Sequence, residues 1–124
     1  MNKEAFVMWG RRFELSIQYD CYGDEDILPA QEEAYALFRS EADRILFSDQ
    51  DIKRYCLEKN KEEIGKNIDN IFKYVMPVSI FVKREKEKHV VALLCDYKFD
   101  MEHGIAIVFE NEKLNQIGIQ DIIL

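Results

Sequence analysis

The sequence predicts an α+β domain in which two to three helices pack on one face of an antiparallel sheet of about five strands. Three observations lead to this fold class. One segment near the N-terminus alternates apolar and polar residues, a central segment spaces its apolar residues as helices do, and the last third consists of four short apolar runs separated by polar turns. No composition shift marks a linker, so we expect a single domain over residues 1–124.

The N-terminal strand covers residues 12–20, RFELSIQYD. Its apolar side chains alternate with polar ones and therefore share one buried face, formed by Phe13, Leu15, Ile17 and Tyr19. Residues 21–29, CYGDEDILP, follow as a loop in which Gly23 and the acids favour turns. Pro29 suits the first turn of a helix, where its missing N–H is not needed. The apolar face of that helix comprises Tyr35, Phe38, Ala42 and Ile45.

Two further helices are expected before the C-terminal strands. Ser48 is expected to cap the second helix, with Asp51 as its capping-box partner. Phe47 and Ile52 occupy the hydrophobic-staple positions around that cap. A third helix is predicted from apolar residues at helical spacing, and Pro77 is expected to end it. Its apolar face comprises Ile64, Ile68, Ile71, Phe72 and Val75.

The last third of the chain is expected to form four strands, over residues 78–84, 89–99, 104–110 and 113–119. Short polar connections between them predict antiparallel neighbours and one N-terminal strand beside a four-stranded meander. The two middle strands are apolar on both faces, so the face away from the helices needs a cover. Residues 6–10, FVMWG, are one candidate cover. Another chain is the other, which would make the protein a homodimer through this second sheet face.

Charge and composition exclude several classes of function. The formal net charge of −7 disfavours nucleic acid as a partner, because binding to phosphates needs a basic surface. No apolar run has the length of a membrane span or of a signal peptide, so no membrane association is expected. The three cysteines are widely spaced and form no C-x-x-C pair, which is typical of reduced thiols. We therefore expect a cytoplasmic protein without a disulfide framework or a zinc site.

The acids are concentrated in residues 14–38, which contain seven Asp or Glu residues and no Lys or Arg. A patch of one sign speeds the capture of an oppositely charged protein. We expect a basic protein partner to bind the loop and the first helical turns through Asp20, Tyr22, Asp24, Glu25, Asp26, Glu32 and Glu33. The alternative is that this acidic face only keeps the protein soluble.

The turn DMEH places Asp100, Glu102 and His103 within four residues. Adjacent side chains on extended backbone point apart, and His89 lies at the other end of the hairpin, so no metal site is expected. The sequence contains no nucleophile motif and no phosphate loop, so neither a catalytic residue nor a cofactor is expected. An alternative is a small enzyme or ligand-binding domain in which Asp100, His103 and Asp121 converge. Its aromatic walls would be Trp9, Tyr19 and Tyr22.

The C-terminal stretch DMEHGIAIVFENEKLNQIGIQDIIL resembles the signature of a bacterial family of small acidic intracellular domains of unknown function. The family pattern is acid-x-Glu-His-Gly, then alternating apolar residues, then Ile-Gly-x-Gln-Asp. The matching positions are Asp100, Glu102, His103, Gly104, Ile117, Gly118, Gln120 and Asp121. The stretches MWGRRFELSIQYDCY and ILPAQEEAYALF also resemble the family's first strand and first helix, so the resemblance covers most of the chain.

Members of such families resemble the immunity proteins of bacterial toxin systems in size and acidity. The resemblance therefore implies a non-enzymatic binding protein, an immunity or antitoxin-like inhibitor of a basic partner such as a nuclease toxin. For the signature residues themselves the expected role is structural, because the Glu-His-Gly turn and the Gly-x-Gln-Asp end would close hairpins of the sheet. A homo-oligomeric structural module is a further alternative.

Overall fold

In the computed structural model, which describes residues 3–124, six strands form one sheet in the order in which they occur along the chain. The strands are β1 (Lys3–Met8), β2 (Arg11–Tyr19), β3 (Val75–Val82), β4 (Val90–Tyr97), β5 (Ile105–Glu110) and β6 (Lys113–Gly118). The helices are α1 (Pro29–Ile45), α2 (Gln50–Lys59) and α3 (Lys61–Ile64), with 3₁₀ turns η1 (Ile71–Lys73) and η2 (Gln120–Ile122). The α+β class predicted from the sequence is confirmed.

The sheet is mixed, whereas the sequence predicted an antiparallel one. β2 and β3 run parallel, and every other neighbouring pair of strands in residues 3–124 is antiparallel. The parallel pair follows from connectivity, because the helices between β2 and β3 carry the chain back to the end of the sheet from which β2 started. The predicted pairing of the two middle strands through the DMEH turn is observed as the β4–β5 hairpin.

The extra strand is β1, which pairs with β2 through the two-residue turn Trp9–Gly10. Both turn residues have positive φ, +51° at Trp9 and +81° at Gly10, as the common tight hairpin turns require. The Trp9 N–H donates a 3.0 Å hydrogen bond to the Leu46 carbonyl oxygen, and its ring lies 5.8 Å from that of Phe72. The FVMWG segment is therefore an edge strand and a turn, and it does not cover the second sheet face.

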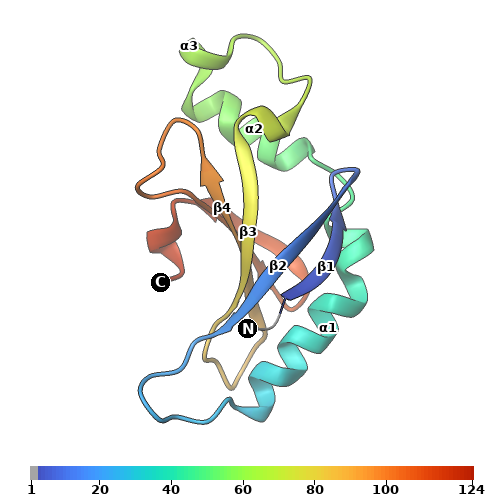
Figure 1. The fold of residues 1–124 in the computed structure, drawn as a ribbon, viewed down its shortest axis with the longest axis vertical. Coiled ribbons are helices and arrows are strands. Elements are labelled where there is room, and N and C mark those ends of the chain that lie inside the picture. Colours follow the sequence, from blue (N-terminus) through green and yellow to red (C-terminus); the bar gives the residue numbers. More distant parts are fainter. Residues whose placement is uncertain (1–2) are drawn as a thin grey trace.

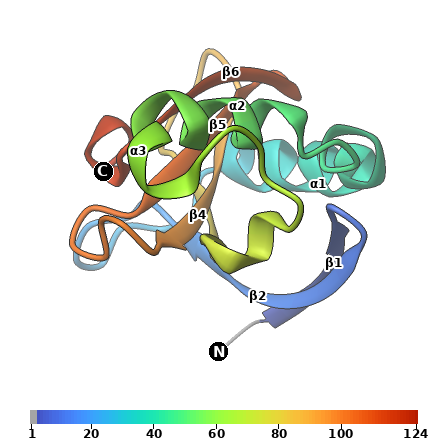
Figure 2. The ribbon, with the colours of Figure 1, turned by 90° about the horizontal axis from the view of Figure 1, so that it is seen from above.

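The helices lie on one side of the sheet, which curls around α1 so that the N-terminal hairpin and β6 stand on opposite sides of it (Figure 2). α1 begins at Pro29 as predicted and turns its buried residues toward the sheet: Gln31, Ala34, Phe38 and Ala42. α2 contributes Ile52 and Cys56 to the same core. No helix in residues 3–124 is long and apolar enough to cross a membrane.

The prediction of one long third helix, with the apolar residues from Ile64 to Val75 on its face, is wrong. α3 is a single turn that ends at Gly65, whose φ of +104° is incompatible with a continuing helix. Of the apolar positions behind the prediction, Ile68 lies in a loop, Ile71 in η1 and Val75 in β3. Their side chains are buried as expected, but from three different elements.

Two other expectations about the helical region fail. Pro77 lies within β3 beside a bulge and does not end a helix. The N-cap of α2 is Asp49, although the Ser48 hydroxyl accepts a 3.2 Å hydrogen bond from the Gln50 N–H. Because the helix starts one residue later than predicted, Phe47 is not in the staple position, and it is 81% exposed.

The second face of β4 and β5 is covered by the C-terminal segment, a solution that the sequence did not suggest. Ile123 is buried against the apolar side chains of this face, which are Val90, Ala92, Leu94, Ala106 and Val108. Phe81 and Ile122 pack at the margin of the same cluster. Residues 119–124 fold back over the sheet as η2, near the C-terminus marked in Figure 1.

Candidate functional site

The loop that connects β2 to α1, residues 20–28, carries most of the predicted partner-binding residues and lies at one end of the long axis of the molecule (Figure 1). Tyr22 is 78% exposed, and Asp24, Glu25 and Asp26 are exposed beside it. We call residues 20–28 the acidic loop. The remaining predicted positions, Glu32 and Glu33, are exposed on the first turns of α1.

A basic residue that lies far away in sequence holds the acidic loop in place. Arg84, from the connection between β3 and β4, donates through Nη1 to the Asp26 carbonyl oxygen at 3.0 Å. Its Nε lies 3.6 Å from Glu25 Oε2, and its main-chain N–H donates to Asp20 Oδ2 at 3.2 Å. Nη1 also contacts Cys21 Sγ at 3.3 Å. One arginine therefore contacts four residues of the loop.

The base of the acidic loop is anchored by Gln31, which is fully buried. Its Oε1 accepts from the Leu28 N–H at 2.9 Å, and its Nε2 donates to the carbonyl oxygens of Asp20 at 3.1 Å and Val82 at 3.2 Å. The side chain thus joins the two ends of the loop to the end of β3. Sequence reasoning missed this residue, because a capping box is recognised by Ser or Thr at the N-cap and here Leu28 is the N-cap.

Fewer acids remain uncompensated at this end of the molecule than the seven acids of residues 14–38 suggest. Arg84 compensates part of the charge of Glu25, and Glu33 lies 3.6 Å from His89. The hairpin tip that carries Arg84 also holds three lysines, Lys83, Lys86 and Lys88, beside Glu85 and Glu87, and Lys88 lies 3.4 Å from Glu110. Asp24, Asp26 and Glu32 form no ion pair with any residue between 3 and 124, so they carry the uncompensated charge of this end.

In the signature turn, Asp100 and His103 interact with each other. Asp100 Oδ1 lies 3.0 Å from His103 Nδ1 and accepts a 3.2 Å hydrogen bond from the His103 main-chain N–H. Hydrogen bonding to Asp100 and its negative charge raise the pKa of His103. Desolvation would raise the pKa of Asp100, but the hydrogen bonds from His103 outweigh it, and the pKa of Asp100 lies below its usual value. Glu102 is exposed beside this pair.

Three other signature residues, Gly104, Gly118 and Gln120, allow η2 to pack on the sheet. Gln120 Nε2 donates to the Cys95 carbonyl oxygen at 3.1 Å, and the Gln120 N–H donates to the His103 carbonyl oxygen at 3.0 Å. Gly104 leaves room for this, since a Cβ there would lie 2.6 Å from both Cys95 O and Gln120 Nε2. Gly118 similarly leaves room for Ile122, whose Cδ1 would lie 3.0 Å from an added Cβ.

Of the groups of the predicted enzyme or ligand site, Asp100 and His103 are paired, but the three aromatic residues do not lie together. No hydrogen bond joins His103 to Asp121 within residues 3–124, and Asp121 is exposed. Trp9 packs on Phe72 at the β1–β2 turn. The other two predicted aromatic walls lie apart from it: Tyr19 packs edge-on to Tyr35, and Tyr22 is in the acidic loop. In this same part of the chain, no group of three or more His, Cys, Asp or Glu side chains could hold a metal ion.

The three cysteines have free thiols, and two of them are buried. Burial raises the pKa of the Cys56 thiol to about 11 and raises that of Cys95 as well. Because a thiol reacts as the thiolate, these two side chains are unreactive at neutral pH. Cys21 is half-buried in the acidic loop beside Arg84.

Comparisons with known proteins place the chain in a family and give no activity. Among curated proteins and solved structures, none matches the chain. One family, described as Domain of unknown function (DUF6985), matches residues 2–124. The match includes the β2–α1 segment, the acidic loop and the C-terminal signature. The chain therefore belongs to the family described as Domain of unknown function (DUF6985).

Proposed function

We propose that this chain is a non-enzymatic binding protein that recognises a basic protein through the acidic loop, as an immunity or antitoxin protein inhibits a basic toxin domain. The observation that carries the proposal is an exposed acidic and aromatic loop that hydrogen bonds from Arg84 and Gln31 tie to the rest of the fold. A loop that served only to solubilise the protein would need neither the Arg84 contacts nor the buried Gln31 anchor.

A loop that is ordered before binding favours affinity. Association normally requires flexible side chains and loops to lose conformational entropy, at about 0.5–1.5 kcal/mol per immobilised side chain. In the acidic loop, Gln31 and Arg84 have already fixed the main chain near Asp20 and Asp26. The partner then binds a loop whose main chain is already ordered, so less conformational entropy is lost on association.

Tyr22 suits the role of an anchor in this interface. It is 78% exposed, while its own main-chain N–H is held by Glu25 Oε1 at 2.7 Å. Tyrosine is enriched among the few residues that dominate binding energies, because it buries a large rigid surface and adds a hydroxyl. We therefore assign the association rate chiefly to the acids and the lifetime of the complex chiefly to Tyr22.

The lysines of the neighbouring hairpin tip, Lys83, Lys86 and Lys88, would limit which basic proteins can bind the acidic loop. A partner that is uniformly basic would meet Lys83, Lys86 and Lys88 as well as the acidic loop. Like charges placed opposite each other disfavour the wrong partner. The proposed partner surface is therefore a basic patch bordered by acidic or neutral residues.

A homodimer through the second sheet face is not part of this proposal. The apolar strands that motivated it are buried by Ile123 and its neighbours within one chain.

Co-expression tests the proposal in cells. The protein encoded next to this chain's gene is the first candidate toxin, and we expect the wild-type chain to restore growth of cells that produce it. The variant Asp24→Lys/Glu25→Lys/Asp26→Lys should fold but protect less, since all three positions are exposed. Equal protection by both proteins would move the interface elsewhere. Absence of protection by the wild type would contradict the inhibitor role for that pair.

A further inference from the structure

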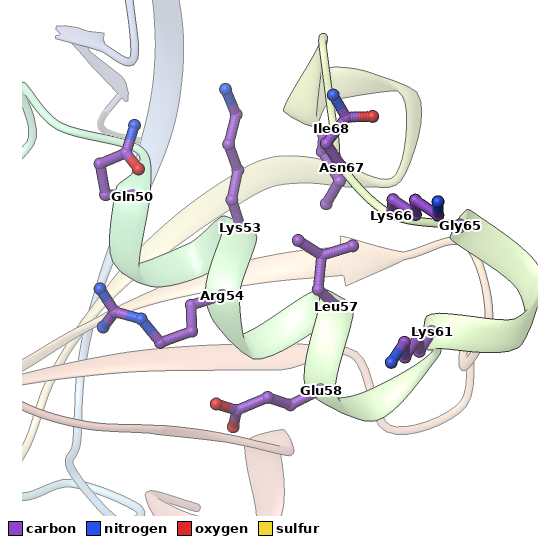
Figure 3. A pocket seen from close by; sticks show the side chains of 10 residues that line it. All are labelled: Gln50, Lys53, Arg54, Leu57, Glu58, Lys61, Gly65, Lys66, Asn67 and Ile68. Carbon is purple, nitrogen blue, oxygen red and sulfur yellow. The ribbon is translucent and has the colours of Figure 1, made fainter.

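A groove of about 540 Å³ lies between α2 and residues 65–68, at the opposite end of the molecule from the acidic loop (Figures 1 and 3). Its volume is within the range of small-molecule sites, about 300–1,000 Å³. The residues that line it are Gln50, Lys53, Arg54, Leu57, Glu58, Lys61, Gly65, Lys66, Asn67 and Ile68. The groove was not predicted, because the apolar residues from Ile64 to Val75 were expected to form one helix.

The lining is basic, in a protein whose net charge is −7. It contains four cationic side chains and one carboxylate, Glu58. Figure 3 shows Glu58 and Arg54 on the side of α2 away from residues 66–68. Lys53 and Leu57 lie on the side of α2 that faces those residues, and Lys61 lies at the end of α2 near Glu58 (Figure 3).

Two of these lysines are available to a ligand. Lys61 and Lys66 are exposed and form no ion pair with any residue in the described range 3–124. Lys53 is 3.1 Å from Asp49, and Arg54 is 3.0 Å from Asp51, so their charges are partly compensated from outside the groove. Lys61 and Lys66 are therefore the lining cations whose charge no ion pair within residues 3–124 compensates, although Glu62 and Glu63 of α3 are exposed nearby in the chain.

The floor of the groove is apolar. Figure 3 shows the Leu57 side chain directed from α2 toward Ile68 and Asn67. Leu57 is half-buried, and Ile68 is 7% exposed. Gly65, directly before Lys66, has a φ of +104°, and residues 66–68 after it lie over α2. A ligand here meets an apolar surface beside two ammonium groups.

We propose that this groove binds a small organic anion, with its phosphate or carboxylate at the lining lysines Lys61 or Lys66 and its apolar body on Leu57. This inference is independent of the proposed partner binding at the acidic loop. The acids of that loop act weakly at this distance, because salt screens charges beyond about 10 Å at 0.1 M ionic strength. The two sites occupy opposite ends of the long axis (Figure 1).

The test is a titration of the ¹⁵N-labelled full chain, followed by NMR, with phenyl phosphate, phenylacetate and the neutral analogue benzyl alcohol. We expect saturable shifts confined to the amides of residues 50–68, with a dissociation constant of about 1 mM or lower for at least one of the two anions. Benzyl alcohol should bind at least about tenfold more weakly. Comparison of the two anions shows whether the site prefers phosphate or carboxylate.

The matched variants are Lys61→Gln/Lys66→Gln and, as a control with the same change in charge, Lys86→Gln/Lys98→Gln. All four lysines are exposed, so both variants should keep the fold, which the unperturbed spectrum checks. The first variant should weaken anion binding about tenfold or more, and the control should leave it unchanged. Shifts that do not saturate, that spread over the whole surface, or that are equal in the two variants would overturn the proposal.

Discussion

Arg84 donates a hydrogen bond of 3.0 Å to the main-chain oxygen of Asp26, across 58 residues of sequence. The contact ties the acidic loop to the β3–β4 hairpin. We expect Arg84→Ala to loosen the loop and leave the sheet intact, because the side chain lies outside the core. An exposed hydrogen bond contributes about 1 kcal/mol, so loop amides should exchange about fivefold faster. Hydrogen exchange of the Tyr22 and Glu25 amides measures this.

Lys86→Ala is the matched control, since Lys86 lies in the same hairpin and is exposed. It should leave exchange in the acidic loop unchanged. Equal exchange in Arg84→Ala and in the wild type would show that other contacts hold the loop. Because the measurement needs no partner, it separates the order of the loop from its proposed function.

Replacing Gln31 should destabilise the whole domain. Gln31→Ala removes a fully buried side chain and leaves the Leu28 N–H and the Asp20 carbonyl oxygen without that partner. Both groups are part-buried, and Gln31 itself is fully buried, so we expect a loss of about 2 kcal/mol in urea unfolding. The exposed Gln18 serves as the control, and Gln18→Ala should change stability by less than about 0.5 kcal/mol.

Alanine substitutions at Gly104 and Gly23 distinguish backbone strain at positive φ from steric conflict of an added Cβ. Their φ values are +58° and +55°, so alanine is similarly strained at both. An alanine at position 23 meets no atom within 4 Å, whereas at position 104 its Cβ would lie 2.6 Å from Cys95 O and Gln120 Nε2. We expect Gly23→Ala to cost about 1 kcal/mol and Gly104→Ala to cost at least about 2 kcal/mol more. Similar losses in thermal unfolding would show that η2 is not fastened through this glycine.

The pKa of His103 should lie above its ordinary value of 6.5, because it hydrogen-bonds to Asp100 and feels its charge. A raised pKa in the folded state means that this contribution to stability is complete below pH 6.5 and is lost as the pH rises through the folded pKa. For Asp100, whose pKa is lowered, the contribution is complete above pH 3.8 and is lost as the pH falls through the folded pKa. The pair therefore stabilises most between these values.

An NMR titration of the His103 ring checks the direction of the shift. Asp100→Asn should lower the pKa of His103 toward 6.5. Asp121→Asn should lower it less, because Asp121 contributes least to the shift. If Asp121→Asn had the larger effect, the two residues would be closer in solution than in this structure, and a site formed by His103 and Asp121 would again be favoured.

Elements whose formation depends on neighbouring residues in the chain were predicted correctly from the sequence. Pro29 marked the start of α1, and alternation located β2. The prediction of the third helix failed because Ile68, Ile71 and Val75 are buried but belong to three different segments. Their spacing in the sequence matches that of a helical face by coincidence. Hydrophobic spacing reports burial, and it cannot by itself distinguish one helix from several short pieces.

The parts of the candidate site that the sequence missed depend on long-range contacts. The acidic loop was located from its composition, but its anchoring by Arg84 and Gln31 joins segments that are far apart in the chain. The second sheet face was expected to be covered by residues 6–10 or by another chain, and the C-terminal segment covers it instead. Gly118 and Gln120 were noted as part of the signature, but their packing with Ile122 and Cys95 appears only in three dimensions.

The lifetime of the proposed complex offers a test of the aromatic anchor. Tyr22→Ala should raise the dissociation rate about thirtyfold, which corresponds to the loss of about 2 kcal/mol typical of an interface hot spot. Tyr55, which is half-buried on α2 at the other end of the molecule, provides the control position. Surface-immobilised partner and purified variants give both rates. An unchanged dissociation rate would remove Tyr22 from the interface.

The association rate with the co-expressed partner tests the central claim most directly. We would compare the wild type, Asp24→Lys/Glu25→Lys/Asp26→Lys, and a control with the same charge change at exposed positions near α3, Glu62→Lys/Glu63→Lys/Asp69→Lys. The account predicts that the wild-type rate falls as salt is raised from 50 to 300 mM, and that reversal in the acidic loop slows association at least about tenfold at the lower salt. The control should slow it much less. Equal rates for the two charge-reversed variants would contradict the account.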